Sequence, residues 1–234
     1  MRLTGLIVVL LLMSGCARAT VSEPESTSAG PLTSITSTAP SSSARTTAPS
    51  TTKPAGVPAD GAPISEVISW IEAGRPADAA GYHVATRDGT TTGLGEDVAF
   101  RVPGTDRRAT VCMTDRARRS DALSCLVDLA KPPAAPTEIY GQWKGGWVDF
   151  DGETVQVGSA HGDPGPFHNG DGPDLATGST LSFGDFRCRA QGSEVFCVNY
   201  AHRTAVRLST AGIATFGCLH PVPQAEGAGE RFSC

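Results

Sequence analysis

The sequence lacks the short motifs by which metal, nucleotide and hydrolase sites are commonly predicted. It has no Cys-x-x-Cys pair of the zinc-ribbon kind and no His-x-x-x-His pair for zinc on a helix. There is no Gly-x-Ser-x-Gly elbow, and Gly93 and Gly95 lack the third glycine of a dinucleotide-binding loop. We therefore expect no metal, no cofactor and no catalytic residue of these familiar kinds.

The sequence also has little positive charge. Residues 61–234 contain 15 Lys and Arg against 21 Asp and Glu. The one cationic cluster is "RARR" at 116–119, and Asp115 and Asp121 flank it, which is typical of a solvated loop. We expect no nucleic-acid partner and no attraction to anionic lipid.

No apolar run is long enough to cross a membrane. The run from Leu3 to Met13 follows Arg2 and would span only about 16 Å as a helix, whereas a bilayer core needs about 30 Å. Residues 1–15 are therefore predicted to be a signal peptide. It ends in "LMSGC", which resembles the lipobox of bacterial lipoproteins. That resemblance implies that the Cys16 thiol receives a diacylglyceryl group, so that the lipid holds the protein on the outer face of a cytoplasmic membrane. The alternative is an ordinary signal peptide in which Cys16 is incidental.

Residues 16–60 contain few large apolar side chains. Between Thr20 and Thr52, 18 of 33 residues are Ser or Thr, with prolines interspersed. Such a composition cannot bury enough surface to offset the ordering entropy of a fold. We predict a disordered tether that joins the lipidated Cys16 to one exported domain at 61–234.

Six cysteines follow Cys16, and an even number in an exported domain predicts three disulfides. The segment "FRCRAQGSEVFCVNY" alternates like a hairpin around a two-residue turn at Gly192–Ser193. In that register Cys188 faces Cys197 as a non-hydrogen-bonded pair, where a disulfide fits.

The other two disulfides follow less directly. Cys112 and Cys125 face each other if Thr114 faces Leu123 across a polar loop. Cys218 and Cys234 then remain, and by elimination they are expected to pair and to fix a polar C-terminal tail, "QAEGAGERFSC", that could detach locally.

The remaining patterns are mostly those of β-strands. "WVDFDGETVQV" at 147–157 predicts a hairpin around Asp151–Gly152, and "YHVAT" and "TAVRLS" alternate likewise. One segment, "PISEVISWIEAG" at 63–74, predicts a helix with an apolar stripe, opened by Pro63 and closed by Gly74. The fold class is thus mainly β: a disulfide-stapled antiparallel domain with one short N-terminal helix.

Polar and turn-forming residues are concentrated in "SAHGDPGPFHNGDGPD" at 159–174. The spacing fails the calcium-loop pattern, and Ser159 and His161 lie on one loop, where a nucleophile and its base rarely meet. Turn formation explains the glycines, prolines and aspartates better. The alternative is a loop-borne metal site at His161 and His168.

Five sequence segments together resemble a mycobacterial lipoprotein family of the LppI type, over essentially the whole exported domain. They are "GAPISEVISWIEAG", "YGQWKGGWVDFDG", "DPGPFHNGDGP", "LSFGDFRCR" and "FCVNYAH". The resemblance implies a lipid-anchored envelope protein and brings no catalytic residues with it.

The sequence favours a noncatalytic binding module for an unidentified envelope component or protein. Trp143 and Trp147 could form an exposed platform for a sugar or peptide, although packing in the core or hairpin is the favoured interpretation. The alternative is an envelope hydrolase in which His161 or His202 works with a carboxylate. His83 and His202 lie in segments that resemble strands, where structural roles are expected.

Overall fold

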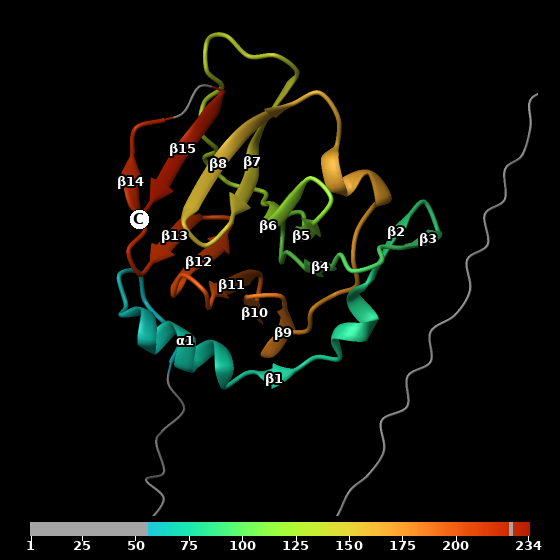
Figure 1. Cartoon of the computed structure of the whole chain (residues 1–234), viewed down its shortest axis with the longest axis vertical. Coiled ribbons are helices and arrows are strands. Elements are labelled where there is room, and N and C mark those ends of the chain that lie inside the picture. The colour runs from blue at the N-terminus through green and yellow to red at the C-terminus, as the bar shows by residue number, and fades with distance from the viewer. Residues whose placement is uncertain (1–55, 225–226) are drawn as a thin grey trace, which may run out of the picture. The chain divides into compact units, whose positions relative to one another are not determined.

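The computed structural model describes residues 56–224 and 227–234, without the side chains of residues 120 and 121. The signal peptide, Cys16 and most of the tether lie outside the described residues. The described part is mainly antiparallel β, as the sequence predicted. Figure 1 shows two sheets stacked on each other, with the helix beneath the lower one.

The first sheet has seven strands, and all its neighbours are antiparallel. Its order is β14 (His220–Val222), β15 (Ala228–Ser233), β8 (Thr154–His161), β7 (Gln142–Phe150), β6 (Arg119–Leu126), β5 (Thr110–Asp115) and β4 (Ala99–Val102).

The second sheet has six strands, and β1 alone pairs in parallel with its neighbour. Its order is β1 (Arg75–Pro76), β9 (Ser179–Phe183), β10 (Phe186–Gln191), β11 (Glu194–Asn199), β12 (Thr204–Ser209) and β13 (Gly212–Phe216). A separate hairpin is formed by β2 (Val84–Arg87) and β3 (Thr90–Gly93), and short 3₁₀ helices lie at η1 (Ala79–Tyr82) and η2 (Gly165–Asn169).

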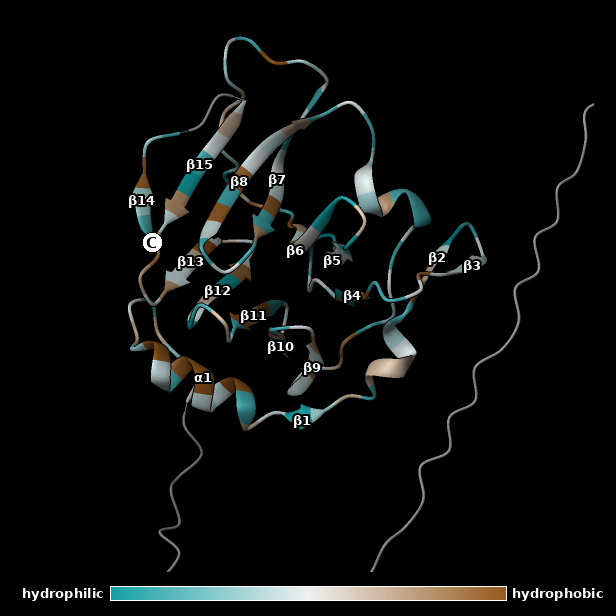
Figure 2. Ribbon diagram, in the orientation of Figure 1, coloured by the Kyte–Doolittle hydropathy of each residue, from teal (hydrophilic) through white to brown (hydrophobic). Residues whose placement is uncertain are grey.

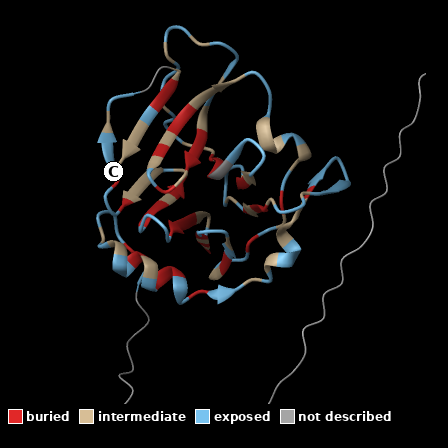
Figure 3. Cartoon of the chain, in the orientation of Figure 1, coloured by how far each residue is buried: buried red, intermediate tan, exposed pale blue. Residues whose placement is uncertain are grey.

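The main core lies between the two sheets. Alternate residues of the longer strands enter it, as the period of two in a strand requires. In β10, Phe186, Cys188 and Ala190 are buried while the two arginines between them are less buried. Figures 2 and 3 show the matching bands of apolar and buried residues along β7, β8 and β15.

The predicted helix forms as α1 (Ile64–Glu72). Its Val67, Trp70 and Ile71 pack on Phe196 and Val198 of β11, on the face of the six-stranded sheet that is turned away from the other sheet. This explains why β11 is almost continuously buried instead of alternating.

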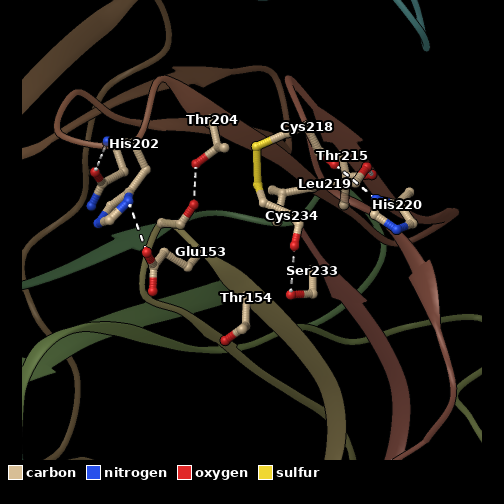
Figure 4. Close-up of a disulfide and its surroundings, with 12 residues drawn as sticks. Glu153, Thr154, His202, Thr204, Thr215, Cys218, Leu219, His220, Ser233 and Cys234 are labelled. Carbon is tan, nitrogen blue, oxygen red and sulfur yellow. Dashed lines mark hydrogen bonds and ion pairs between the residues drawn. A yellow bond between two sulfur atoms is a disulfide. The ribbon is translucent and has the colours of Figure 1, made fainter.

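All three predicted disulfides are confirmed. Cys188 faces Cys197 in the predicted register, with Gly192 of the turn at a φ of 59°. Cys112 faces Cys125, just as Thr114 faces Leu123. The Cys218–Cys234 bond joins the chain end to the segment between β13 and β14 (Figure 4).

The C-terminal tail differs from the prediction. Residues Ala228–Ser233 form β15, which pairs with β8 on one side and β14 on the other, so the tail is part of a sheet and not a detachable end. The segment reads AGERFS, and only Phe232 in it has a strong strand preference. Its partner strand lies about seventy residues earlier in the chain, and pairing of this kind overrides local propensity.

Three smaller predictions are also wrong. His83 follows η1 and precedes β2, and His202 lies in the turn between β11 and β12, where the Asn199 side chain accepts the His202 backbone N–H at 3.2 Å. Neither histidine is in a strand.

Ser159 and His161 do not belong to a loop, because β8 continues through His161. Arg119, expected in a solvated loop, begins β6 and pairs with Asp149.

Candidate functional site

A groove of about 640 Å³ opens on the outer face of the seven-stranded sheet. Arg101, Val111, Leu126 and Trp147 line it from four successive strands, β4 to β7. Each of them is adjacent in sequence to a residue of the main core, such as Cys112 or Cys125. Because neighbouring side chains of a strand point to opposite faces, the groove lies on the face turned away from the core. Two cavities elsewhere in the described part are much smaller, at about 160 and 170 Å³.

The groove exists because β6 and β7 separate at its floor. Their pairing ends at Leu126 and Trp147, after which the Val127 N–H donates to the Gly146 carbonyl at 2.8 Å and the two chains part. Gly145 and Gly146 have no side chains that could fill the space where the strands separate. A Cβ on Gly146 would lie 1.9 Å from the Val127 carbonyl oxygen, so the close approach requires glycine here.

Trp143 forms one side of the groove and is half-buried. Its indole N–H donates to the Pro133 carbonyl at 3.1 Å, and its ring lies over Gly158 of β8. Gly158 has a φ of 82°, and a Cβ there would come within 2.6 Å of the ring. The orientation of this indole is therefore set by the bare backbone beneath it.

Trp147 is only 3% exposed, so the hypothesis that both tryptophans form an exposed platform is wrong and the packing interpretation is right. Its ring stacks on His161 with centroids 3.6 Å apart, and Phe167 of η2 meets it edge-on at 5.0 Å. Trp147 nevertheless contributes atoms to the groove wall.

Charged side chains surround the groove. Arg101 pairs with Asp174 at 2.6 Å and more distantly with Asp171 at 3.9 Å, and the Asp174 hydrogen bond raises the pKa of Arg101. Asp128 lies 3.7 Å from the Arg107 guanidinium.

Unlike Arg101, the other two cations that line the groove are unpaired in the described structure. Arg108 and Lys144 are exposed, and neither side chain has a hydrogen-bond or ion-pair partner among the described residues.

Asp149 lies beneath Trp147 and is almost fully buried. It accepts hydrogen bonds from the Ser124 hydroxyl at 2.5 Å and from the Trp147 indole at 3.0 Å, and it pairs with Arg119. Ser124 and Asp149 are both only 4% exposed, so a substrate in the groove would not reach the hydroxyl, and we assign this cluster a structural role.

His161 does not meet a nucleophile either. Its Nε2 is buried and has no hydrogen-bond partner in the described structure, and burial lowers the pKa of the imidazole. His202 does have a carboxylate partner, because its Nδ1 lies 3.5 Å from Glu153 (Figure 4). Within the described residues, no Ser, Thr or Cys side chain is hydrogen-bonded to either imidazole.

The segment after His161 is built from turns. The Asp163 carboxylate accepts the Gly165 N–H at 2.7 Å, and the His168 ring hydrogen-bonds to the Gly165 carbonyl at 2.8 Å. His161 instead stacks on Trp147, so the two histidines do not share a site. No group of three or more His, Cys, Asp or Glu side chains suited to a metal occurs in 56–224 and 227–234.

The sequence indicated the two tryptophans of the groove but none of its charged residues, because they come from separate strands and loops. No protein-family model, curated protein or solved structure matches the chain. None of the helices in the described residues has the length and apolar character needed to span a bilayer.

Proposed function

We propose that this chain is a lipid-anchored protein of the bacterial cell envelope whose β domain binds an envelope component without catalysis. The observation that carries the proposal is the groove of about 640 Å³, since ligand sites are typically concave, of this size, and lined by apolar surface with a few polar groups. The resemblance to the LppI-type lipoprotein family supports the same assignment.

Location outside the cytoplasm is supported by the three disulfides. Such bonds persist in oxidising compartments and are rare where glutathione keeps thiols reduced. Attachment rests on the "LMSGC" segment, in which Cys16 would carry the lipid. A tether of 44 residues (17–60) would then reach about 36 Å as a flexible chain, enough to hold the groove clear of the headgroups.

The anchor is tested at Cys16. In cells fed a labelled fatty acid, we expect the wild-type chain to carry the label and Cys16→Ala to carry none, because the thiol is the acceptor. Cys112→Ala/Cys125→Ala removes two other cysteines and should remain labelled. Incorporation of label into Cys16→Ala would rule out the anchor.

Binding in the groove is tested by filling it. Ala109 lines the groove, so Ala109→Trp should abolish retention of envelope extract by the immobilised chain lacking residues 1–16. Ala176→Trp adds the same bulk at an exposed position outside the groove and should leave retention unchanged. Equal retention by all three proteins would remove the groove from the proposed function.

A hydrolase is the second candidate, and the His202–Glu153 pair is the observation that favours it. A histidine held by a carboxylate could serve as a general base. The chain should show no turnover of ester, peptide or glycan substrates. Turnover that His202→Ala abolishes, with folding retained, would favour the hydrolase over the binding module.

A further inference from the structure

We propose that the groove binds an anionic saccharide, with the negative group held between Arg108 and Lys144. The proposal rests on the proposed function and names the ligand class of the same groove. It is carried by three features of the groove: its charge, its closed backbone edges, and the mixture of groups along its wall.

The charge of the groove is opposite to that of the chain. Three cations line it, namely Arg101, Arg108 and Lys144, against the two carboxylates Asp128 and Asp171, in a protein of net charge −5. Arg101 is already neutralised by Asp174 and Asp171. The side chains of the two remaining cations have no partner among the described residues, and an unpaired guanidinium and ammonium that line one groove can both donate to a carboxylate or phosphate.

A peptide strand cannot add to the backbone at this place. The outer edge of β4 is already occupied, because the Arg101 N–H donates to the Pro173 carbonyl at 2.9 Å and the Arg101 carbonyl accepts the Leu175 N–H at 2.7 Å. Where β6 and β7 part, the Val127 N–H donates to the Gly146 carbonyl and the Val127 carbonyl accepts the Leu129 N–H. Recognition by strand addition needs such groups to be free, so strand addition is disfavoured here and the side chains of the lining become the main recognition groups.

The side chains offer both kinds of hydrogen bond and an apolar surface. Leu126 and the half-buried Trp143 supply most of the apolar part, with smaller contributions from Val111 and Trp147. Asp128 and Asp171 can accept hydrogen bonds, while Arg108 and Lys144 can only donate. A sugar ring has a C–H face and hydroxyl groups that both donate and accept, and an acidic sugar adds the anion that the cations require.

The test measures binding of defined probes by calorimetry with the chain lacking residues 1–16. We expect trigalacturonate, a carboxylate saccharide, or a phosphorylated mannotriose to bind, and neutral galactotriose to bind at least tenfold more weakly. The stronger of the first two identifies the anion. Arg108→Glu/Lys144→Glu should weaken binding of that probe at least tenfold. Added salt should weaken it in the wild type, because exposed charges are screened.

Arg75→Glu/Arg203→Glu is the matched control, since it makes the same charge change at two exposed arginines associated with the six-stranded sheet and should bind as the wild type does. Absence of binding by both anionic probes, equal binding of galactotriose, or tighter binding of triglutamate would overturn the ligand class. If envelope extract is still retained by the wild type and lost in Ala109→Trp, the proposed function survives that failure. If extract retention fails as well, both proposals fall.

Discussion

A single carboxylate shows how a buried charge is kept in this fold. The Asp149 side chain is 5% exposed, whereas the side chain of its partner Arg119 is 46% exposed. The charge is stabilised by three donors, from Arg119, Ser124 and Trp147, so it holds together residues of two strands. A buried carboxylate with several donors contributes more than an exposed ion pair.

Asp149→Asn is therefore expected to lower the free energy of unfolding by about 1–3 kcal/mol, because the amide keeps an acceptor but loses the charge that Arg119 and the other donors stabilise. Asp174→Asn is the control, since Asp174 also pairs with an arginine at 2.6 Å but its side chain is 49% exposed. The free energy of unfolding of Asp174→Asn should fall by less than about 1 kcal/mol. Urea unfolding of the two variants measures the difference, and equal losses would show that burial at Asp149 is unimportant.

His161 should make stability depend on pH. Burial lowers the pKa of its imidazole, and the charged groups that act on it are Asp149, Arg119, Asp163 and Lys144. The folded chain thus binds this proton less readily than the unfolded chain. The stabilisation is complete above an unfolded pKa of about 6.5 and is lost as pH falls through the folded value.

We expect His161→Phe, which keeps a ring against Trp147, to lose less stability than the wild type between pH 7.5 and pH 5. Thermal unfolding at the two pH values measures this difference. His220→Gln removes an exposed imidazole and should follow the wild type. An identical pH dependence in wild type and His161→Phe would contradict the burial of His161.

Among the elements, β7 and β8 depend on glycine to place an indole. Gly158 has a φ of 82° and supports the Trp143 ring, and Gly178 has a φ of 79° with open space around it. Gly178→Ala should cost about 1–2 kcal/mol for the backbone conformation alone. Gly158→Ala should cost a further 1–3 kcal/mol or so, because the ring can move only by losing its bond to Pro133. Urea unfolding compares the variants, and equal costs would mean that the ring adjusts freely.

Elements governed by local chemistry were predictable from the sequence. The β10–β11 hairpin followed from Gly192 and strict alternation, and α1 followed from its apolar stripe between Pro63 and Gly74. β15 could not be predicted, because its preference for a strand comes from distant β8. The groove could not be predicted for a related reason. Its cations come from β4, β7 and the segment before β5, which only the sheet order brings together.

In the whole domain, the three disulfides differ in where they lie. Cys112–Cys125 and Cys188–Cys197 each link the two strands of a hairpin, and Cys218–Cys234 closes the C-terminal segment. The paired cysteines are 13, 9 and 16 residues apart in the sequence. Cys188 and Cys197 are fully buried between the sheets, whereas Cys218 and Cys234 are exposed. From loop-closure entropy alone, the Cys188–Cys197 bond should stabilise the fold by about 2.7 kcal/mol and the Cys218–Cys234 bond by about 3.1 kcal/mol. These two values are too close to rank the disulfides.

Burial should decide the ranking. Cys188→Ala/Cys197→Ala also leaves a void in the main core, which adds about 2 kcal/mol to its cost, whereas Cys218→Ala/Cys234→Ala opens no buried space and leaves β15 paired with β8. We therefore expect the first variant to melt several degrees lower than the second. Circular dichroism on heating measures both, after nonreducing peptide mapping has established the remaining bonds. If the second variant melts lower, the chain end would depend on its disulfide more than on the pairing of β15.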